Sequence, residues 1–179
     1  MTAKSQVEFG LMGGINESTL LTGNKTNYYL TGFEAGITSE INLSRRFYLF
    51  PELIGITKGY ATDDSHLRYL YLNLPVLAGY RIQKHIELLA GPNFGYMISI
   101  IPDPTHFSDL MRKFEYGFCG TARFRINART GIDISYLQSL SGIYKSENHV
   151  DGNTYGVASK YNPVNLTFQM TFFYLLTGH

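Results

Sequence analysis

Residues 114–126 read FEYGFCGTARFRI and alternate between two kinds of side chain with a period of two. One face carries aromatic and aliphatic residues, namely Phe114, Tyr116, Phe118, Ala122, Phe124 and Ile126. The other face carries small, polar and charged residues, namely Glu115, Gly117, Cys119, Thr121, Arg123 and Arg125. Successive side chains of a β-strand point to opposite faces, so the pattern predicts a strand between an apolar and a polar environment.

The same alternation recurs along the chain in segments of about the length with which a tilted strand crosses a bilayer. It predicts eight strands, at residues 6–14, 31–43, 47–58, 68–82, 85–99, 114–126, 130–144 and 164–176. Tight turns at 44–46, 83–84 and 127–129 alternate with longer connections at 15–30, 59–67, 100–113 and 145–163. We therefore predict an all-β fold, an eight-stranded antiparallel up-and-down transmembrane β-barrel that fills residues 1–179 as a single domain. The turns and both termini are expected on the periplasmic side, with the longer loops outside.

Two features of the faces predict that the apolar one points outward to lipid, the reverse of a soluble lipocalin-type barrel. The polar face contains Gly36, Gly79, Gly91, Gly95 and Gly117, which suit the crowded interior of an eight-stranded barrel. Aromatic residues near the strand ends predict two girdles at the headgroup regions. The girdle toward the loops contains Tyr69, Tyr96, Phe114, Tyr116, Tyr144 and Tyr161, and the girdle toward the turns contains Phe47, Tyr80, Phe124 and Tyr174.

Charges of both signs on the polar face are a third indication of the same orientation. Buried charges need partners, and carboxylates can pair with guanidinium groups. We predict a structural charge network in the lumen made of Glu34, Glu40, Glu52, Arg81, Glu87, Glu115, Arg123, Arg125 and Asp133. These side chains would plug the lumen, so no open pore is expected.

Composition excludes several classes of protein. Charged residues make up only 16% of the 179 residues, and the net charge of +1 comes without a basic stripe, which argues against a nucleic-acid partner. The single cysteine excludes an internal disulfide and a multi-cysteine metal site. No apolar run is long enough for a transmembrane helix. Residues 1–6 carry no apolar signal core, so we expect the native precursor to have an upstream signal peptide that is removed.

Short motifs in strand order resemble the outer-membrane β-barrel domains abundant in Bacteroidetes, the PorT-like group of eight-stranded barrels similar to OmpA and OmpX. They are Phe50-Pro51-Glu52-Leu53, Lys58-Gly59, Tyr71-Leu72-Asn73-Leu74-Pro75, Ala90-Gly91-Pro92, Gly95-Tyr96 and Gly117. The resemblance spans most of the chain and implies the fold and an outer-membrane location, but no single activity. The chain departs from the group at Asn73, where the group often has Glu, and at Gly79, where it often has Lys.

Candidate catalytic and metal-binding residues are few, and each has a simpler interpretation. Two loops contain the sets Asp63-Asp64-Ser65-His66 and His106-Phe107-Ser108-Asp109, which could supply a serine nucleophile with its base. Asp and Ser also populate turns for backbone reasons, which is the favoured interpretation. His85 and His149 lack metal-ligand spacing, Cys119 is expected as a small lumen filler, and Asp151-Gly152-Asn153 is expected to be a turn rather than a calcium loop. No cofactor or metal is expected.

The sequence therefore predicts a non-enzymatic structural or interaction barrel of the outer membrane, with an accessory role in secretion or surface assembly suggested by the PorT-like resemblance. Its expected partners are outer-membrane lipid or lipopolysaccharide and a protein bound through the loops at 15–30, 100–113 and 145–163. Three alternatives stay open: an outer-leaflet lipid-modifying enzyme, a soluble lipocalin-like carrier and a small channel. Lumen carboxylates acting as a proton or ion path belong to the last alternative.

Overall fold

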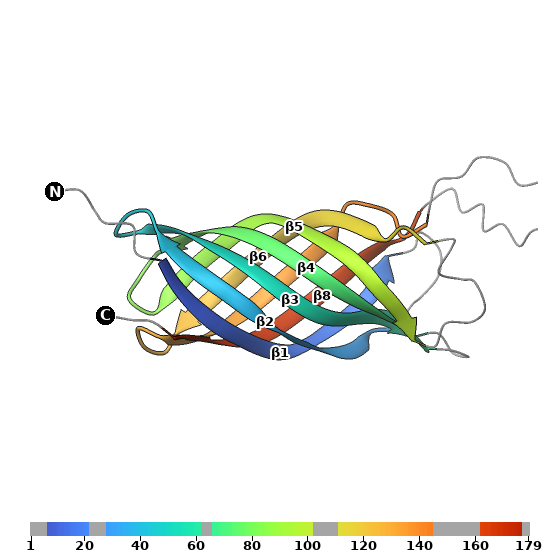
Figure 1. The fold of residues 1–179 in the computed structure, drawn as a ribbon, viewed down its shortest axis with the longest axis horizontal. Coiled ribbons are helices and arrows are strands. Elements are labelled where there is room, and N and C mark those ends of the chain that lie inside the picture. The colour runs from blue at the N-terminus through green and yellow to red at the C-terminus, as the bar shows by residue number, and fades with distance from the viewer. Residues whose placement is uncertain (1–6, 22–27, 62–65, 102–110, 145–161, 177–179) are drawn as a thin grey trace, which may run out of the picture.

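The chain folds into eight antiparallel strands in a computed structural model that describes residues 7–21, 28–61, 66–101, 111–144 and 162–176 (Figure 1). The strands are β1 (Val7–Leu21), β2 (Leu30–Asn42), β3 (Phe47–Ala61), β4 (His66–Arg81), β5 (Ile86–Ile101), β6 (Phe114–Arg125), β7 (Thr130–Ser139) and β8 (Val164–Leu175). No helix in the described ranges is long and apolar enough to cross a membrane.

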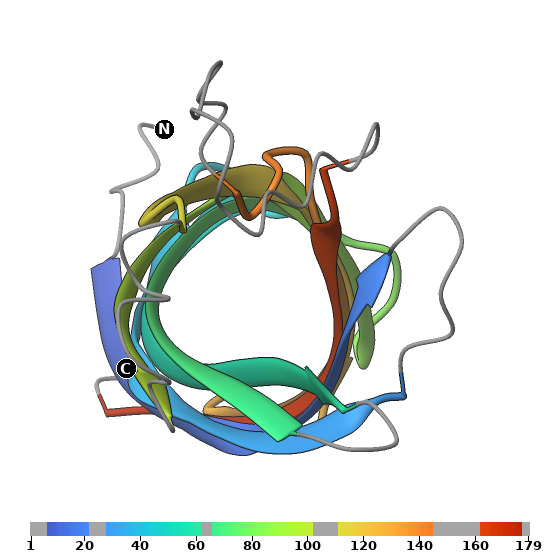
Figure 2. The same cartoon turned by 90° about the vertical axis from the view of Figure 1, so that its right-hand side faces the viewer.

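Each strand pairs with the next one along the chain, and β1 pairs with β8 to close the barrel (Figure 2). The register is continuous across the closure, where Gly14 lies opposite both Glu34 of β2 and Thr171 of β8. Closure leaves no strand edge unpaired, which a sheet surrounded by lipid requires. The predicted up-and-down topology of eight strands is confirmed.

Apolar side chains cover the outer wall of the barrel, as predicted. The side chains of Ile37, Leu72 and Phe168 are 56%, 42% and 45% exposed, although each is a large hydrophobic group in the middle of a strand. The polar residues next to them in sequence, Thr38, Asn73 and Thr167, are buried inside. We call this outward surface the apolar wall. The end of the barrel with the three short connections is the turn end, and the opposite end is the loop end.

The lumen is less polar than the sequence predicts. On β3, the side chains of Phe50, Ile54 and Ile56 point inward and are almost completely buried. They join Leu77, Met97 and other inward residues in one buried apolar cluster. Eight strands enclose a space that side chains must fill, and apolar groups do so wherever no charge needs solvating.

Two strand ends and the faces assigned to two tyrosines differ from the prediction. β1 continues to Leu21, because its backbone stays paired with β8 up to Val164, and inside the barrel Ser18 accepts a hydrogen bond of 2.7 Å from the backbone N–H of Gly59. β7 ends at Ser139, whose hydroxyl donates to the carbonyl of Ser141 at 2.9 Å as the chain leaves the ladder. The remaining bounds shift by at most three residues from those predicted.

Tyr69, which the sequence places in the loop-side aromatic girdle, points into the lumen instead and is only 1% exposed. It shares the inward face of β4 with Tyr71, and the two rings meet edge to face at 6.4 Å. Tyr144 is partly buried against the inner cluster, and Tyr161 lies outside the described residues. The outward girdle residues Tyr96, Phe114 and Tyr116 are exposed toward the loop end, as predicted.

Candidate functional site

The charged side chains of the lumen form three clusters, and the first lies near the turn end. Arg81 donates to Glu40 and, at 2.6 Å, to the side-chain oxygen of Asn42. Arg125 donates to Glu40 at 2.7 Å and through two nitrogens to Glu87 at 3.0 Å each. Each carboxylate therefore contacts both guanidinium groups, because Arg81 also lies 3.4 Å from Glu87. Continuous pairing of this kind offsets the cost of burying charge.

The second cluster fills the middle of the barrel and is centred on Arg123. Its guanidinium makes two parallel hydrogen bonds to Asp133, of 2.8 and 2.7 Å, from Nε and Nη2. Its carbon Cζ lies 3.7 Å from the ring centre of Phe50 and 4.1 Å from that of Phe173. The cation is thus held between two aromatic rings while a carboxylate neutralises it, an arrangement that closes the lumen at this level.

Glu34 and Glu52 are buried in the lumen like the other carboxylates but differ from them in their partners. Glu34 accepts hydrogen bonds from Gln169 and Thr171 of β8. Within the described ranges, no cation lies within 4 Å of either Glu34 or Glu52. These two predicted members therefore lie beside the ion pairs without joining one.

The third cluster lies toward the loop end and contains a residue that the sequence analysis missed. Lys58 is 2% exposed, and its Nζ lies 2.6 Å from Glu115 and 4.7 Å from the ring centre of Tyr71. Glu115 also accepts a hydrogen bond from Asn165. Lys58 is an even number of positions from Glu52 on the same strand, so alternation places both side chains on the inner face. The predicted network also contained more carboxylates than cations. Both features of the sequence indicate one further buried cation.

The lumen should carry no ion current. Arg123, Phe50 and Phe173 are fully buried against one another inside it, and we expect them to leave no path for a hydrated ion. We expect planar bilayers containing the protein to show no conductance steps above background, whereas an added porin serves as the positive control. Regular steps that appear only with the protein would contradict this prediction.

Gly79 provides room for an aromatic ring inside the turn end. A Cβ at this position would lie 2.3 Å from the Tyr48 ring, whose hydroxyl donates to Glu87 at 2.6 Å. Because Tyr48 is 1% exposed and cannot move aside, Gly79→Val should lower the free energy of unfolding by about 1–3 kcal/mol. Gly13→Ala is the matched control, since its Cβ would meet its nearest atom at 3.5 Å, and it should change stability by less than about 0.5 kcal/mol. Equal effects of the two substitutions in urea unfolding would refute the packing role.

The remaining candidates for chemistry are not brought together. Cys119 is buried in the lumen as a free thiol, 3.6 Å from the Thr121 hydroxyl. His85 lies in an exposed turn with Nδ1 at 2.8 Å from the carbonyl of Arg125. Among the described residues, no three His, Cys, Asp or Glu side chains are placed to hold a metal ion. The other candidates lie outside the described residues, namely residues 63–65, 106–109, 149 and 151–153. His66 is described, but its predicted partner Ser65 is not.

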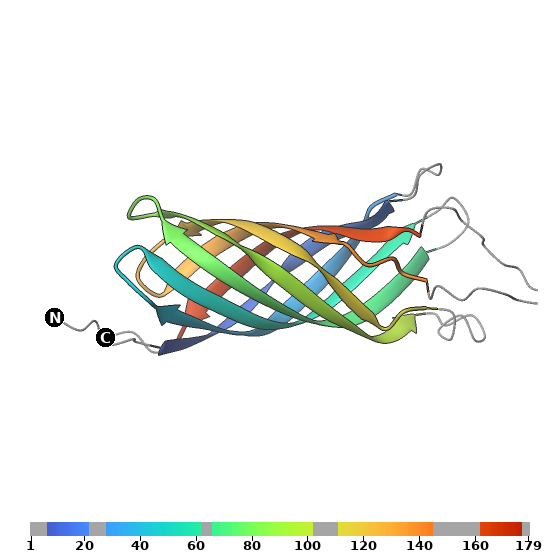
Figure 3. The same ribbon diagram turned by 90° about the horizontal axis from the view of Figure 1, so that it is seen from above.

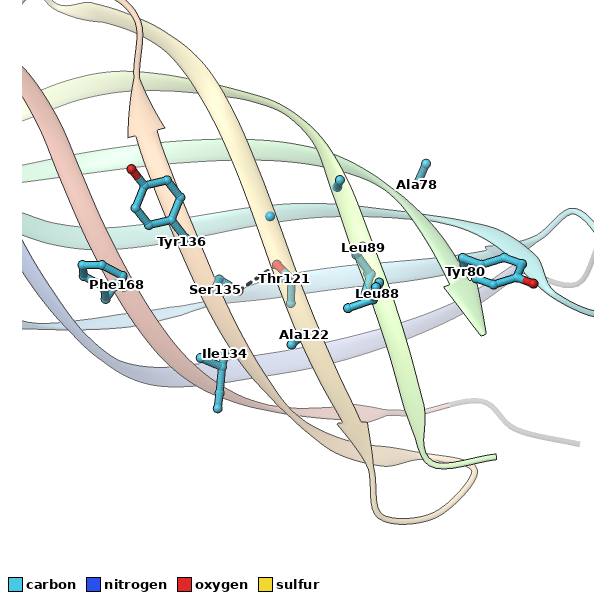
Figure 4. A pocket seen from close by; sticks show the side chains of 12 residues that line it. Ala78, Tyr80, Leu88, Leu89, Thr121, Ala122, Ile134, Ser135, Tyr136 and Phe168 are labelled. Carbon is cyan, nitrogen blue, oxygen red and sulfur yellow. Dashed lines mark hydrogen bonds between the residues drawn. The ribbon is translucent and has the colours of Figure 1, made fainter. Parts of the chain in front are cut away.

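A shallow groove of about 610 Å³ runs across the apolar wall over β4 to β8 (Figure 4). Its floor is a row of small residues, because Ala78 pairs with Ala90 and Ala90 with Gly120. Tyr136 and Phe168 continue the row and stand at its border, with their ring centres 5.3 Å apart. The groove opens to the outside of the barrel, like the rest of the apolar wall. Its lining contains no ionisable group apart from the tyrosines.

A closed antiparallel barrel with an apolar wall and paired charges inside has the architecture of an outer-membrane β-barrel protein. Residues 2–145 match the family described as "Outer membrane protein beta-barrel domain". The chain belongs to this family, and the protein is located in the outer membrane. A search of curated proteins finds no match.

Solved structures with the same fold include a protein of Yersinia pestis and a Neisserial protein. Ail, the attachment invasion locus protein of Yersinia pestis, crystallised with the heparin analogue sucrose octasulfate, is 13% identical with a TM-score of 0.54. The alignment covers 96% of this chain and 99% of Ail. Neisserial surface protein A is 7% identical with a TM-score of 0.58, and 94% of this chain and 98% of that one are covered. At these identities the likeness concerns the fold alone.

Proposed function

We propose that this protein is a non-enzymatic structural and interaction barrel, which holds its longer loops at the cell surface for contact with a partner. The filled lumen is the observation that supports this most. Arg123, held by Asp133 between two aromatic rings, occupies the space that a transport path would need. When side chains occupy the interior of a barrel, only its two ends and its outer wall can bind other molecules.

The proposal extends to the whole chain, residues 1–179, as a single domain. The apolar wall contacts lipid or lipopolysaccharide, and the connections at the loop end, between β1 and β2, β5 and β6, and β7 and β8, contact a protein. The motifs around Asn73 and Gly91 resemble the PorT-like group of Bacteroidetes, and this resemblance supports an accessory role in secretion or surface assembly. The buried charge network of the lumen serves stability and takes no part in chemistry.

The partner can be sought by crosslinking in native membranes, followed by purification in mild detergent. A variant in which residues 147–158 are replaced by a short Gly-Ser turn is the matched control, provided that it keeps the heat-dependent electrophoretic shift of a folded barrel. We expect at least one surface or secretion protein that copurifies with the natural chain and is lost from the variant. Identical sets of proteins from both chains would reject the loop-mediated role.

The enzyme alternative is separated by lipid analysis of cells with and without the protein. Because the lumen cations Lys58, Arg81, Arg123 and Arg125 are all held in ion pairs, we expect the profiles of lipid A and of phospholipids to be unchanged. A lipid species whose acylation depends on the protein would overturn the non-enzymatic proposal and direct attention to Ser65 and Ser108. Sucrose octasulfate, the ligand in the Ail structure, is a suitable probe for a carbohydrate partner in a parallel binding assay.

A further inference from the structure

The three turns lie together at one end of the barrel (Figure 3) and share one pattern of backbone hydrogen bonds. In each turn the first residue donates its N–H to the carbonyl four positions later: Leu43 to Phe47 at 3.0 Å, Ile82 to Ile86 at 3.0 Å and Ile126 to Thr130 at 2.9 Å. The three turns therefore hold their third and fourth residues in equivalent backbone positions.

These turns are basic, and none of them contains an acidic residue. The third and fourth positions carry Arg45 and Arg46 in one turn, Lys84 and His85 in the next, and Ala128 and Arg129 in the last. The loop-end connections, in contrast, mix charges of both signs, for example Asp63, Asp64, Arg112 and Lys113. We call Arg45, Arg46, Lys84 and Arg129 the basic rim.

An exposed aliphatic side chain precedes the cations in every turn. Leu43, Ile82 and Ile126 are each about half exposed and extend the apolar wall to its edge at the turn end. A membrane protein meets acyl chains at its apolar surface and headgroups directly beyond that surface. The basic rim therefore lies at the depth of the lipid headgroups of the adjacent leaflet.

One cation of the rim is held on the lipid side of the barrel. The Nη1 of Arg46 donates to the Tyr80 hydroxyl at 3.2 Å. Tyr80 belongs to the outward aromatic girdle, and its ring lies 5.0 Å from that of Phe47. The guanidinium is thus fixed against the outer surface at the girdle, and its other N–H groups remain able to donate to an anion.

We propose that the basic rim binds the phosphate groups of anionic phospholipids in the leaflet at the turn end, with Arg46 and Tyr80 as its most ordered part. Charge complementarity selects this occupant, because the three turns carry cations and no carboxylate next to a membrane surface where anionic headgroups supply the matching charge. The rim enriches such lipids around the barrel and fixes how deeply the turn end sits. It lies at the opposite end from the loops, so it acts independently of the proposed surface partner.

The absence of tryptophan from the chain makes a test at each end of the barrel practicable. Phe47→Trp introduces a single fluorophore at the turn end, and Tyr96→Trp introduces one at the loop end. Each protein is placed in phosphatidylcholine vesicles that contain a small, equal fraction of either brominated phosphatidylglycerol or brominated phosphatidylcholine. Bromine quenches tryptophan only when the lipid is adjacent, so the ratio of the two quenching efficiencies measures local enrichment.

We expect phosphatidylglycerol to be enriched roughly two- to five-fold at Phe47→Trp in low salt, with the enrichment falling toward one as salt screens the rim. Combined Arg45→Gln, Arg46→Gln, Lys84→Gln and Arg129→Gln should remove the enrichment at Phe47→Trp and leave the ratio at Tyr96→Trp unchanged. The matched control neutralises two loop-end cations, Arg68→Gln and Arg112→Gln, and should retain the enrichment at the turn end.

Equal quenching by the two lipids at Phe47→Trp would overturn the proposal, as would enrichment that survives the four substitutions. The salt series on the Phe47→Trp protein needs no charge variant, so it decides the question even if the fourfold variant does not fold.

Discussion

Arg123→Met is expected to lower the free energy of unfolding by about 3–5 kcal/mol, because it leaves the buried carboxylate of Asp133 without its cation. Arg123 is fully buried and donates two hydrogen bonds to Asp133, of 2.8 and 2.7 Å, from between the rings of Phe50 and Phe173. Removing one member of such a pair costs far more than removing both. The change is measured by equilibrium unfolding of the protein from lipid vesicles in urea, with the electrophoretic mobility of the folded barrel as the readout.

Two further variants separate the loss of the ion pair from a general disturbance of the lumen. Arg123→Met combined with Asp133→Asn removes both charges and should recover most of the lost stability. Glu52→Gln neutralises a carboxylate that has no described cation within 4 Å, so its free energy of unfolding should stay within about 1 kcal/mol of the natural protein. A double variant no more stable than Arg123→Met would contradict the pairing, and so would an Arg123→Met protein of natural stability.

Ile134→Arg is expected to lower the free energy of unfolding in a bilayer by about 2–4 kcal/mol. Ile134 lies in the middle of β7 and is 52% exposed on the apolar wall, so the substitution places a cation among acyl chains. The matched control is Ile126→Arg in the adjacent turn, where the cation reaches the headgroups and should cost about 0–1 kcal/mol. Unfolding of both variants in the same vesicles gives the comparison, and an equal cost at the two depths would contradict the membrane position of the wall.

The alternation of side chains predicted the strands and their faces wherever the two faces differ in polarity. On β6, Tyr116 and Phe118 are exposed and Glu115 and Arg123 are buried, as the period of two requires. The closed topology followed from the alternation of short and long connections, and the pairing of β1 with β8 confirms it.

The remaining features depend on distances that a sequence does not contain. Phe50 and Ile54 are apolar on the inner face of β3, so alternation could not distinguish them from wall residues such as Leu53. The polar residues 16–19 were predicted to lie in a loop, but they are part of β1, because a strand can continue with polar residues beyond the apolar part of the wall. Lys58 joins Glu115, 57 positions away, and a contact of that separation follows only from the closed register.

The specific pairs within the lumen network could not be predicted either. The sequence identified the inward carboxylates and guanidinium groups as a set, but the tilt of the strands decides which of them meet. Arg125 reaches Glu40, 85 positions away, across the turn end, whereas Arg123 reaches Asp133 directly on the neighbouring strand. The structural role of this network stays a prediction that the Arg123 and Glu52 variants test.

The orientation of the wall can be measured without any substitution, by nuclear magnetic resonance of isoleucine methyl groups in lipid nanodiscs. Ile37, Ile98 and Ile134 are more than half exposed on the outside, whereas Ile54 and Ile56 are buried inside and serve as internal controls. We expect cross-relaxation between lipid acyl-chain protons and the methyl groups of the first three residues, and none for the last two. Lipid contacts at Ile54 and Ile56 with none at Ile37 and Ile134 would contradict the membrane-facing apolar wall.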